Sequence, residues 1–297
     1  MPLRPLACAI AFLPMLLTPS ISRATGALIE TELGRGYLGL ELGFWDEFNQ
    51  DSAPEAWQFA SWNLSIAANQ YKYSENSEYE LLRGHDFGGG FGFDYRNFLN
   101  VDAYVYTSRT QENDFTQNGA ELRAAFYFGG PHEPAESLKD HKSHSYRLGL
   151  GLGASEVNQD FKMNNEMFEL LLGGPLGDHF SFEATGQWSS YSESAEALRA
   201  LEDTPAAKFT MINITTSVAE LPKSSGQLQL TYHHDSEWDL ALTGKSTELY
   251  YDGSFATETR LLWTQYLETA HWSLGATAWN SYGDTEYTVV SKIGFDF

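Results

Sequence analysis

The sequence predicts an all-β protein, a transmembrane antiparallel up-and-down β-barrel of about 14 strands, with 12 as the alternative. Apolar and polar residues alternate with a period of two in many segments, which is the pattern of strands whose two faces meet different surroundings. No run of 18 consecutive apolar residues follows residue 27, which excludes a helical membrane protein. The chain also begins with a segment typical of exported proteins.

That first segment, residues 1–24, has the composition of a secretory signal peptide. Arg4 supplies the positive start, residues 6–17 the apolar stretch, and Ser22-Arg23-Ala24 a small-x-small cleavage site. The sequence therefore predicts a signal peptide at 1–24, removed on export, and one barrel domain at 25–297.

The strands follow from the alternation. It is clearest in residues 38–44, 62–68, 120–128, 146–154 and 180–188, where every second residue is apolar. With the weaker segments included, the predicted strands are, in order, 37–45, 57–72, 79–94, 98–108, 118–128, 144–155, 162–172, 178–190, 207–219, 226–233, 237–250, 254–267, 270–280 and 285–297.

The last predicted strand carries the most specific pattern. One face holds apolar residues and the other holds Glu286, Thr288, Lys292 and Asp296; the apolar residues are Tyr287, Val289, Ile293, Phe295 and Phe297. With its terminal Phe, the strand resembles the membrane-insertion signal of Gram-negative outer-membrane β-barrels, the porin-like superfamily, and no particular subfamily. The resemblance implies a place in the cell outer membrane, contact with outer-membrane lipid and lipopolysaccharide, and the barrel-assembly machinery as a partner.

Strand parity predicts which connections face outward. With an even number of strands and both termini in the periplasm, residues 46–56, 129–143, 173–177, 220–225 and 281–284 are expected outside the cell. One connection fits badly, because residues 191–206 are long and look helical yet fall on the periplasmic side, where turns are short. Either this segment is a small periplasmic or lumen-entering helix, or a strand elsewhere is wrongly split or fused.

The charge balance limits the partners. A formal net charge of −22 makes nucleic-acid binding a poor expectation and favours cations over anions. The predicted inward faces contain ionisable residues of both signs, the candidates for a lumen lining: Glu41, Asp102, Glu121, Arg123, Arg147, Glu183, Glu258, Arg260, Glu286 and Lys292. They indicate either a channel whose fixed charges set ion selectivity or cross-strand ion pairs in a filled lumen.

Two glycine columns lie on predicted inward faces: Gly88, Gly90 and Gly92 on one strand and Gly149, Gly151 and Gly153 on another. Bare backbone there widens the lumen, or allows an aromatic side chain such as Tyr104 or Tyr106 to lie across it. The alternative is a place where a substrate or plug approaches the backbone.

Histidines cluster twice. The loop from His132 to His144 is rich in His and carboxylates, but its spacing matches no compact metal motif, so an acidic solvated loop is expected and no metal or cofactor is predicted. His233, His234 and Asp235 raise the alternative of a rim enzyme, for which a His near a carboxylate and a hydroxyl at the outer leaflet would be the sign.

The expected function is therefore a porin-like channel for passive passage of small hydrophilic solutes, preferring cations or neutral molecules, and not an enzyme. The alternatives are a barrel without transport, such as an adhesin or structural protein, and an outer-membrane hydrolase.

Overall fold

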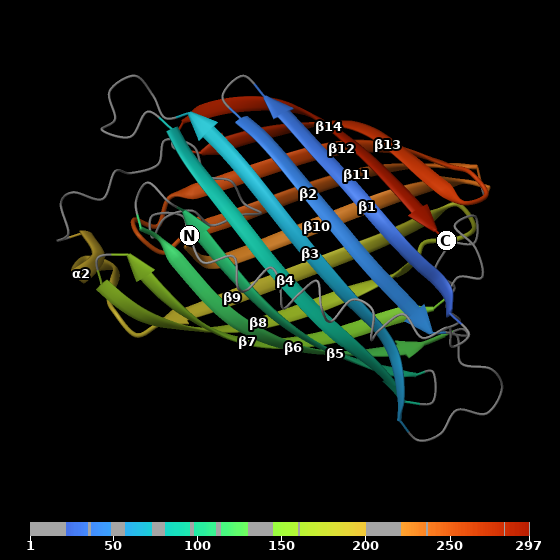
Figure 1. Cartoon of the computed structure of the whole chain (residues 1–297), viewed down its shortest axis with the longest axis horizontal. Helices are drawn as coiled ribbons and strands as arrows, with labels where there is room; N and C mark the ends of the chain where they lie inside the picture. Colours follow the sequence, from blue (N-terminus) through green and yellow to red (C-terminus); the bar gives the residue numbers. More distant parts are fainter. Residues whose placement is uncertain are drawn as a thin grey trace, which may run out of the picture.

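The structure is a computed structural model, which describes residues 22–34, 37–48, 57–72, 81–95, 98–110, 114–129, 145–159, 161–199, 221–235, 237–281 and 283–296. These residues form one closed barrel of fourteen antiparallel strands (Figure 1). The predicted fold class is confirmed, and 14 rather than 12 strands form the wall within the described residues. The strands are β1 (Ser22–Gly34), β2 (Tyr37–Phe48), β3 (Gln58–Lys72), β4 (Leu81–Tyr95), β5 (Leu99–Thr110), β6 (Thr116–Phe128), β7 (Tyr146–Gln159), β8 (Phe161–Pro175), β9 (Phe180–Tyr191), β10 (Pro222–His234), β11 (Trp238–Leu249), β12 (Phe255–Tyr266), β13 (Ala270–Ser281) and β14 (Asp284–Asp296).

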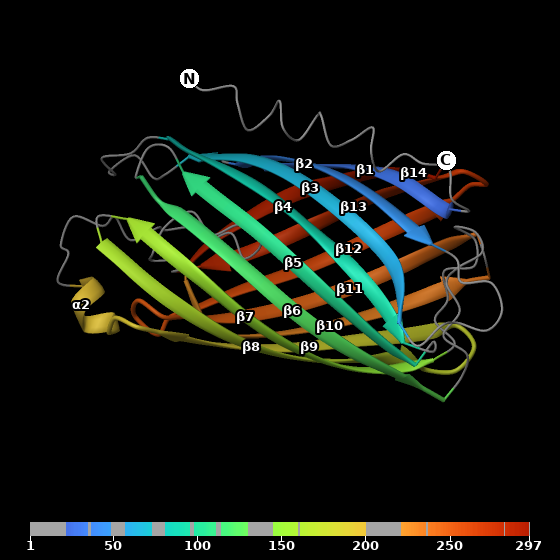
Figure 2. The same cartoon turned by 60° about the horizontal axis from the view of Figure 1, so that its bottom comes forward.

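Every strand pairs with its neighbours in sequence, and β1 pairs with β14 to close the wall (Figure 2). In this closing pair Glu30 lies opposite Lys292, and Ile29 lies opposite Ile293. Closure removes the free sheet edges that an open sheet of this size would expose.

The strand prediction was wrong at its first element. Residues 22–34 form β1, although the first predicted strand was 37–45. Their alternation is present in the sequence, with Ile29, Thr31 and Leu33 on one face and Glu30 and Glu32 on the other. The residues predicted to end the signal peptide, 22–24, are the first three residues of this strand.

A predicted strand at 207–219 lies outside the described residues. β9 pairs directly with β10, so no other strand stands between them in the barrel wall.

The extra strand at 22–34 changes the side of many connections. The β2–β3, β6–β7 and β8–β9 connections lie at the end where β1 starts and β14 stops. They correspond to the ranges 46–56, 129–143 and 173–177, of which 46–48 and 173–175 belong to β2 and β8. They were expected at the other end, because parity was counted from the wrong first strand. The β13–β14 connection at 281–284 does lie opposite to the start of β1, and residues 222–225, expected in a loop, open β10.

The same correction moves residues 191–206 to the opposite end of the barrel from the one expected. The β9–β10 connection lies opposite to the start of β1, and its first part contains the short helix α2 (Ala195–Arg199) (Figure 1). The helical appearance of this segment is confirmed for these five residues. Long connections occur at both ends, because β6 and β7, joined at the end where β1 starts, are separated by residues 129–145.

The two faces of the wall differ as the alternation predicted. Aliphatic and aromatic side chains cover the outside and are exposed there, among them Leu152 at 62%, Val289 at 53% and Tyr287 at 72%. On β14 the inner neighbours Thr288 and Val290 are buried. In the described part of the chain no helix is long and apolar enough to cross a membrane.

Aromatic pairs gather on the outer surface at the end where β1 starts. Phe128 contacts Tyr146 with ring centroids 5.8 Å apart, Phe180 contacts Tyr232 at 5.2 Å, and Tyr232 contacts Trp238 at 5.6 Å. Trp263 and Trp272 meet edge to face at 5.1 Å on the same rim.

Candidate functional site

The candidate site is the polar inner face of the barrel. The register places all ten predicted ionisable residues on this face: Glu41, Asp102, Glu121, Arg123, Arg147, Glu183, Glu258, Arg260, Glu286 and Lys292. They do not form one site. The structure divides most of them between two groups on different parts of the wall, and sequence periodicity could not predict that division.

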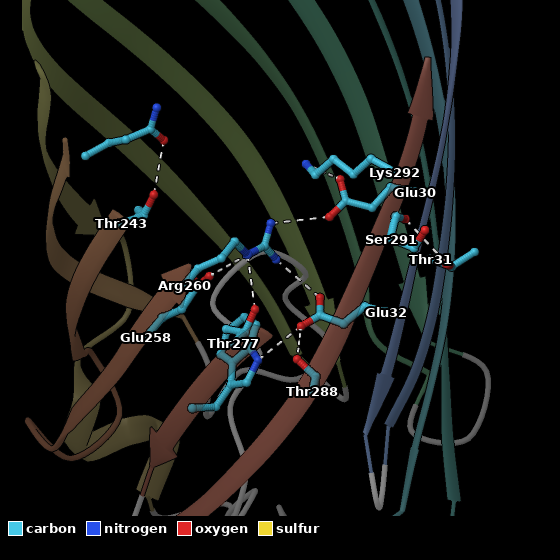
Figure 3. A network of polar contacts seen from close by, with 12 residues as sticks. Glu30, Thr31, Glu32, Thr243, Glu258, Arg260, Thr277, Thr288, Ser291 and Lys292 are labelled. Atoms are coloured by element: carbon cyan, nitrogen blue, oxygen red, sulfur yellow. Dashed lines mark hydrogen bonds and ion pairs between the residues drawn. The ribbon is translucent and has the colours of Figure 1, made fainter. Parts of the chain in front are cut away.

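The first group is organised by Arg260 on β12 (Figure 3). Its guanidinium reaches across β13 and β14 to β1, where Nη1 lies 3.3 Å from Glu30 Oε1 and Nη2 lies 3.3 Å from Glu32 Oε2. Its Nε donates to Thr277 Oγ1 at 3.2 Å and lies 3.4 Å from Glu258 Oε1. One cation thus holds three carboxylates from two distant parts of the chain.

Further donors complete this group. Trp279 Nε1 donates to Glu32 Oε1 at 3.3 Å, and the Thr288 hydroxyl donates to the same oxygen. Lys292 forms an ion pair with Glu30 (Figure 3). Buried carboxylates are tolerated only when cations and hydrogen-bond donors compensate their lost hydration, and the seam between β12 and β1 supplies both.

In the second group, arginine side chains reach across a neighbouring strand at a position where that strand has a glycine. Arg123 on β6 reaches over Gly151 of β7 to Glu169 of β8, with Nε 3.0 Å from Glu169 Oε1, and also lies 3.0 Å from Glu121. Arg147 on β7 likewise reaches over Gly173 of β8 and forms an ion pair with Glu183 of β9.

The rings of two tyrosines also lie over glycines of neighbouring strands. Tyr104 lies over Gly88 of β4, and its hydroxyl is 2.9 Å from Ser65 Oγ on β3. Tyr106 lies over Gly119 of β6 instead. Their rings are nearly parallel, with centroids 6.3 Å apart. The expectation that an aromatic side chain such as Tyr104 or Tyr106 lies across the first glycine column is confirmed by Tyr104, whereas the ring of Tyr106 turns toward the other neighbouring strand.

Two cavities open along this inner face. A cavity of about 530 Å³ is bordered by Asp86, Asp102, Tyr104, Tyr106 and Glu121, among others. A second, of about 210 Å³, is lined by Glu30, Glu32, Tyr37, Glu41 and neighbours. They share the lining residues Ser65, Asp86 and Tyr104, so the two spaces adjoin.

A third polar group lies at the end of the barrel where β1 starts. His233 Nδ1 is 2.8 Å from Asp239 Oδ1, and His233 Nε2 is 2.8 Å from Ser181 Oγ. The Tyr266 hydroxyl donates to the second oxygen of Asp239 at 3.0 Å. A His does therefore contact a carboxylate and a hydroxyl, but on the inner face of β9, β10 and β11. The neighbouring His234 lies on the outer face, stacked on Trp238 at 4.9 Å.

No group of three His, Cys, Asp or Glu side chains in the described ranges could hold a metal ion. The histidine-rich loop from His132 to His144 lies outside those ranges.

Sequence reasoning missed several inner-face acids and cations: Glu30, Glu32, Asp86, Glu169 and Lys245. Glu30 and Glu32 stand on the strand that was not predicted. Glu169 stands between Phe168 and Leu170, and this alternation is the signal that would have found it. Lys245 stands between Gly244 and Ser246 and lacks that signal.

No family model matches the chain, and a comparison with curated protein sequences finds no match. Among solved structures, CdiB from Acinetobacter baumannii is similar with a TM-score of 0.51 at 7% identity, over 94% of this chain and 60% of that chain. The outer membrane protein Omp33 of Acinetobacter baumannii (TM-score 0.48, 8% identity, 93% of this chain and 99% of that chain) and the KdgM porin (TM-score 0.43, 9% identity, 92% and 99%) are also similar. At such identities, the similarity shows the fold alone.

Proposed function

We propose that this protein is a porin-like channel of the Gram-negative outer membrane that lets small hydrophilic solutes pass and prefers cations or neutral molecules. The observation that carries the proposal is the pair of adjoining, acid-lined cavities on the inner face of a closed barrel. Rings of carboxylates on a pore wall select cations by electrostatics.

The outer surface supports the membrane part of the proposal. Exposed aliphatic side chains cover the wall between the two ends, and aromatic pairs surround one rim. Such a surface is costly in water and favourable in hydrocarbon, with the aromatic residues at the interface with the lipid headgroups.

The charges around the two cavities support the proposed preference for cations. Glu41, Asp86 and Asp102 border the cavities, and Arg123, the one arginine or lysine among their lining residues in the described chain, already contacts Glu121 and Glu169. The wall therefore attracts cations more than anions.

The remaining parts of the proposal follow from a place in the outer membrane. The end where β1 starts would face the periplasm, and α2 would face outward. Export would require removal of a signal peptide near residue 24, insertion by the barrel-assembly machinery, and contact with lipopolysaccharide.

The test is single-channel conductance of refolded protein, without the leader, in a planar bilayer under a salt gradient. Lasting discrete steps with cation preference are expected. A silent bilayer, from protein shown to be folded by heat-modifiable gel migration, would overturn the channel and favour a structural or adhesive barrel.

The Ser181–His233–Asp239 contacts are the observation that would favour a hydrolase. Catalysis by such a group also needs donors for the developing oxyanion. β9 pairs on both sides along its length, which engages backbone amides near Ser181 in the sheet. The arrangement is therefore best explained as a polar clamp that joins three strands.

A further inference from the structure

We propose that the 530 Å³ cavity beside Tyr104 and Tyr106 is a binding site for primary ammonium ions, amines that carry a short apolar body. The inference rests on the proposed channel, of which it names a solute class. Its evidence is separate: the shape of the cavity and the hydrogen-bonding balance of the cavity wall.

The tyrosines form a flat aromatic floor. Each ring has one face against a glycine, Gly88 for Tyr104 and Gly119 for Tyr106, while both tyrosines border the cavity. A side chain at either glycine would overlap the ring that covers it, so this arrangement depends on the absence of a Cβ. A cation above a tyrosine face is attracted by the negative face of the ring.

The charges around this floor are mostly negative. Asp86, Asp102 and Glu121 border the cavity, and the one guanidinium among its lining residues in the described chain, that of Arg123, contacts both Glu121 and Glu169. Arg123 is thus compensated from two sides, and the carboxylates of Asp86 and Asp102 are left to act on a solute.

Two side chains of the wall each have an oxygen acceptor without a hydrogen-bond partner among the described residues. Asn165, which borders the cavity and is 7% exposed, donates from Nδ2 to Ser155 Oγ at 3.3 Å, but its Oδ1 has no partner among the described residues. Oδ1 of Asp86 likewise has none in the described part of the chain. A buried acceptor without a donor costs free energy, and rotation of either side chain toward the cavity would let an incoming N–H group recover it.

These features together select one ligand chemistry. A primary ammonium has three donors, no acceptor and a full positive charge, so it complements carboxylates, an unpaired amide oxygen and tyrosine faces at once. A quaternary ammonium has the charge but no donor, and a sugar hydroxyl has donors but no charge. The volume suits a small organic molecule rather than a bare ion.

The test measures binding to the folded protein in detergent by titration calorimetry, so that it does not depend on conduction. The probes are n-butylammonium, tetramethylammonium and maltose. n-Butylammonium is expected to bind more tightly than either of the others, and Asp86→Asn is expected to weaken it about tenfold. Asp94→Asn, on the same face of β4 but away from the cavity, is the matched control and should leave affinity nearly unchanged.

A second pair of variants tests the aromatic floor. Tyr104→Leu should weaken n-butylammonium binding about tenfold, whereas Tyr127→Leu, an inner-face tyrosine outside this cavity, should not. If Tyr104→Leu fails to fold, the Asp86→Asn comparison decides. Equal affinity for n-butylammonium and tetramethylammonium, tighter binding of maltose, or no effect of Asp86→Asn would overturn the proposal.

Conductance separates this proposal from the channel. Binding by a protein that forms no pore would leave the site intact and reject the channel. An open pore that neither binds nor is blocked by n-butylammonium would reject the site and leave the channel intact.

Discussion

Arg123 on β6 and Glu169 on β8 form a two-pronged ion pair across the intervening strand, with Nε–Oε1 at 3.0 Å and Nη2–Oε2 at 3.2 Å. The residue beneath them on β7 is Gly151. A Cβ built there would lie 3.0 Å from Glu169 Cβ and 3.4 Å from Arg123 Cγ. The glycine is what allows a charged pair to lie flat along the wall and leave space in the lumen.

Replacing this glycine should therefore loosen the pair. We expect Gly151→Val to push Arg123 and Glu169 apart and to lower the free energy of unfolding by about 1–3 kcal/mol, as overpacking does elsewhere. Urea unfolding of the refolded protein measures it. Gly244→Val is the control, because a Cβ there meets nothing within 4 Å and the change should stay within about 0.5 kcal/mol. Equal losses in the two variants would show that the crossing does not depend on Gly151.

The paired acids should set the ion selectivity. Glu121→Gln with Glu183→Gln removes carboxylates that hold Arg123 and Arg147, so the lumen becomes more positive and cation preference should fall. The reversal potential in a salt gradient measures this change. Glu166→Gln, on the outer face of β8, should leave the potential unchanged. An unchanged potential in the double variant would count against a lumenal role for the two acids.

The Arg260 group should matter for stability. Arg260→Met leaves Glu30, Glu32 and Glu258 without their shared cation, and the loss of one partner from a buried charge group costs about 3–5 kcal/mol. The unfolding midpoint in urea is the measurement. Lys162→Met breaks the exposed pair with Glu156 and should cost under about 1 kcal/mol. A similar small cost for Arg260→Met would mean that water already solvates the three carboxylates.

The Ser181–His233–Asp239 contacts are expected to be structural. His233→Ala should lower the free energy of unfolding by about 1–3 kcal/mol, since Asp239 and Ser181 lose their partner. His234→Ala, its outward neighbour, removes ring contacts with Trp238 and Tyr232 and should cost under about 1 kcal/mol.

A serine-reactive probe decides whether the Ser181–His233–Asp239 contacts have a structural or a catalytic role. We expect no labelling of Ser181 by a fluorophosphonate. Labelling that disappears in both Ser181→Ala and His233→Ala would instead establish an activated nucleophile and revive the hydrolase.

The faces of the strands could be predicted from the sequence because the side-chain period of a strand is two. Thus Glu121 and Arg123 fall on the inner face while Leu122 is exposed on the outer one. The first strand was missed because its start overlaps the predicted signal peptide, and that omission reversed the assignment of connections such as 173–177. The misplaced long connection at 191–206 was already evidence of an error of this kind.

Partners across strands could not be predicted in the same way. Arg260 and Glu30 are 230 residues apart and meet only because β1 pairs with β14. Arg123 and Arg147 each cross a neighbouring strand where that strand has a residue without a Cβ, Gly151 and Gly173. Alternation specifies a face, whereas these contacts depend on register, closure and the neighbouring side-chain volume.

The outer face provides the most direct test of the membrane assignment. Leu152 lies in the middle of β7 and is 62% exposed, so Leu152→Arg should destabilise the protein folded in lipid vesicles by about 2–4 kcal/mol, the cost of a cation near the bilayer midplane. Leu176, 49% exposed in the β8–β9 connection, is the matched control, and Leu176→Arg at the rim should cost about 0–1 kcal/mol. Guanidinium unfolding from vesicles measures both. Equal small costs at the two positions would mean that water surrounds the middle of the wall, and would place this barrel outside the bilayer.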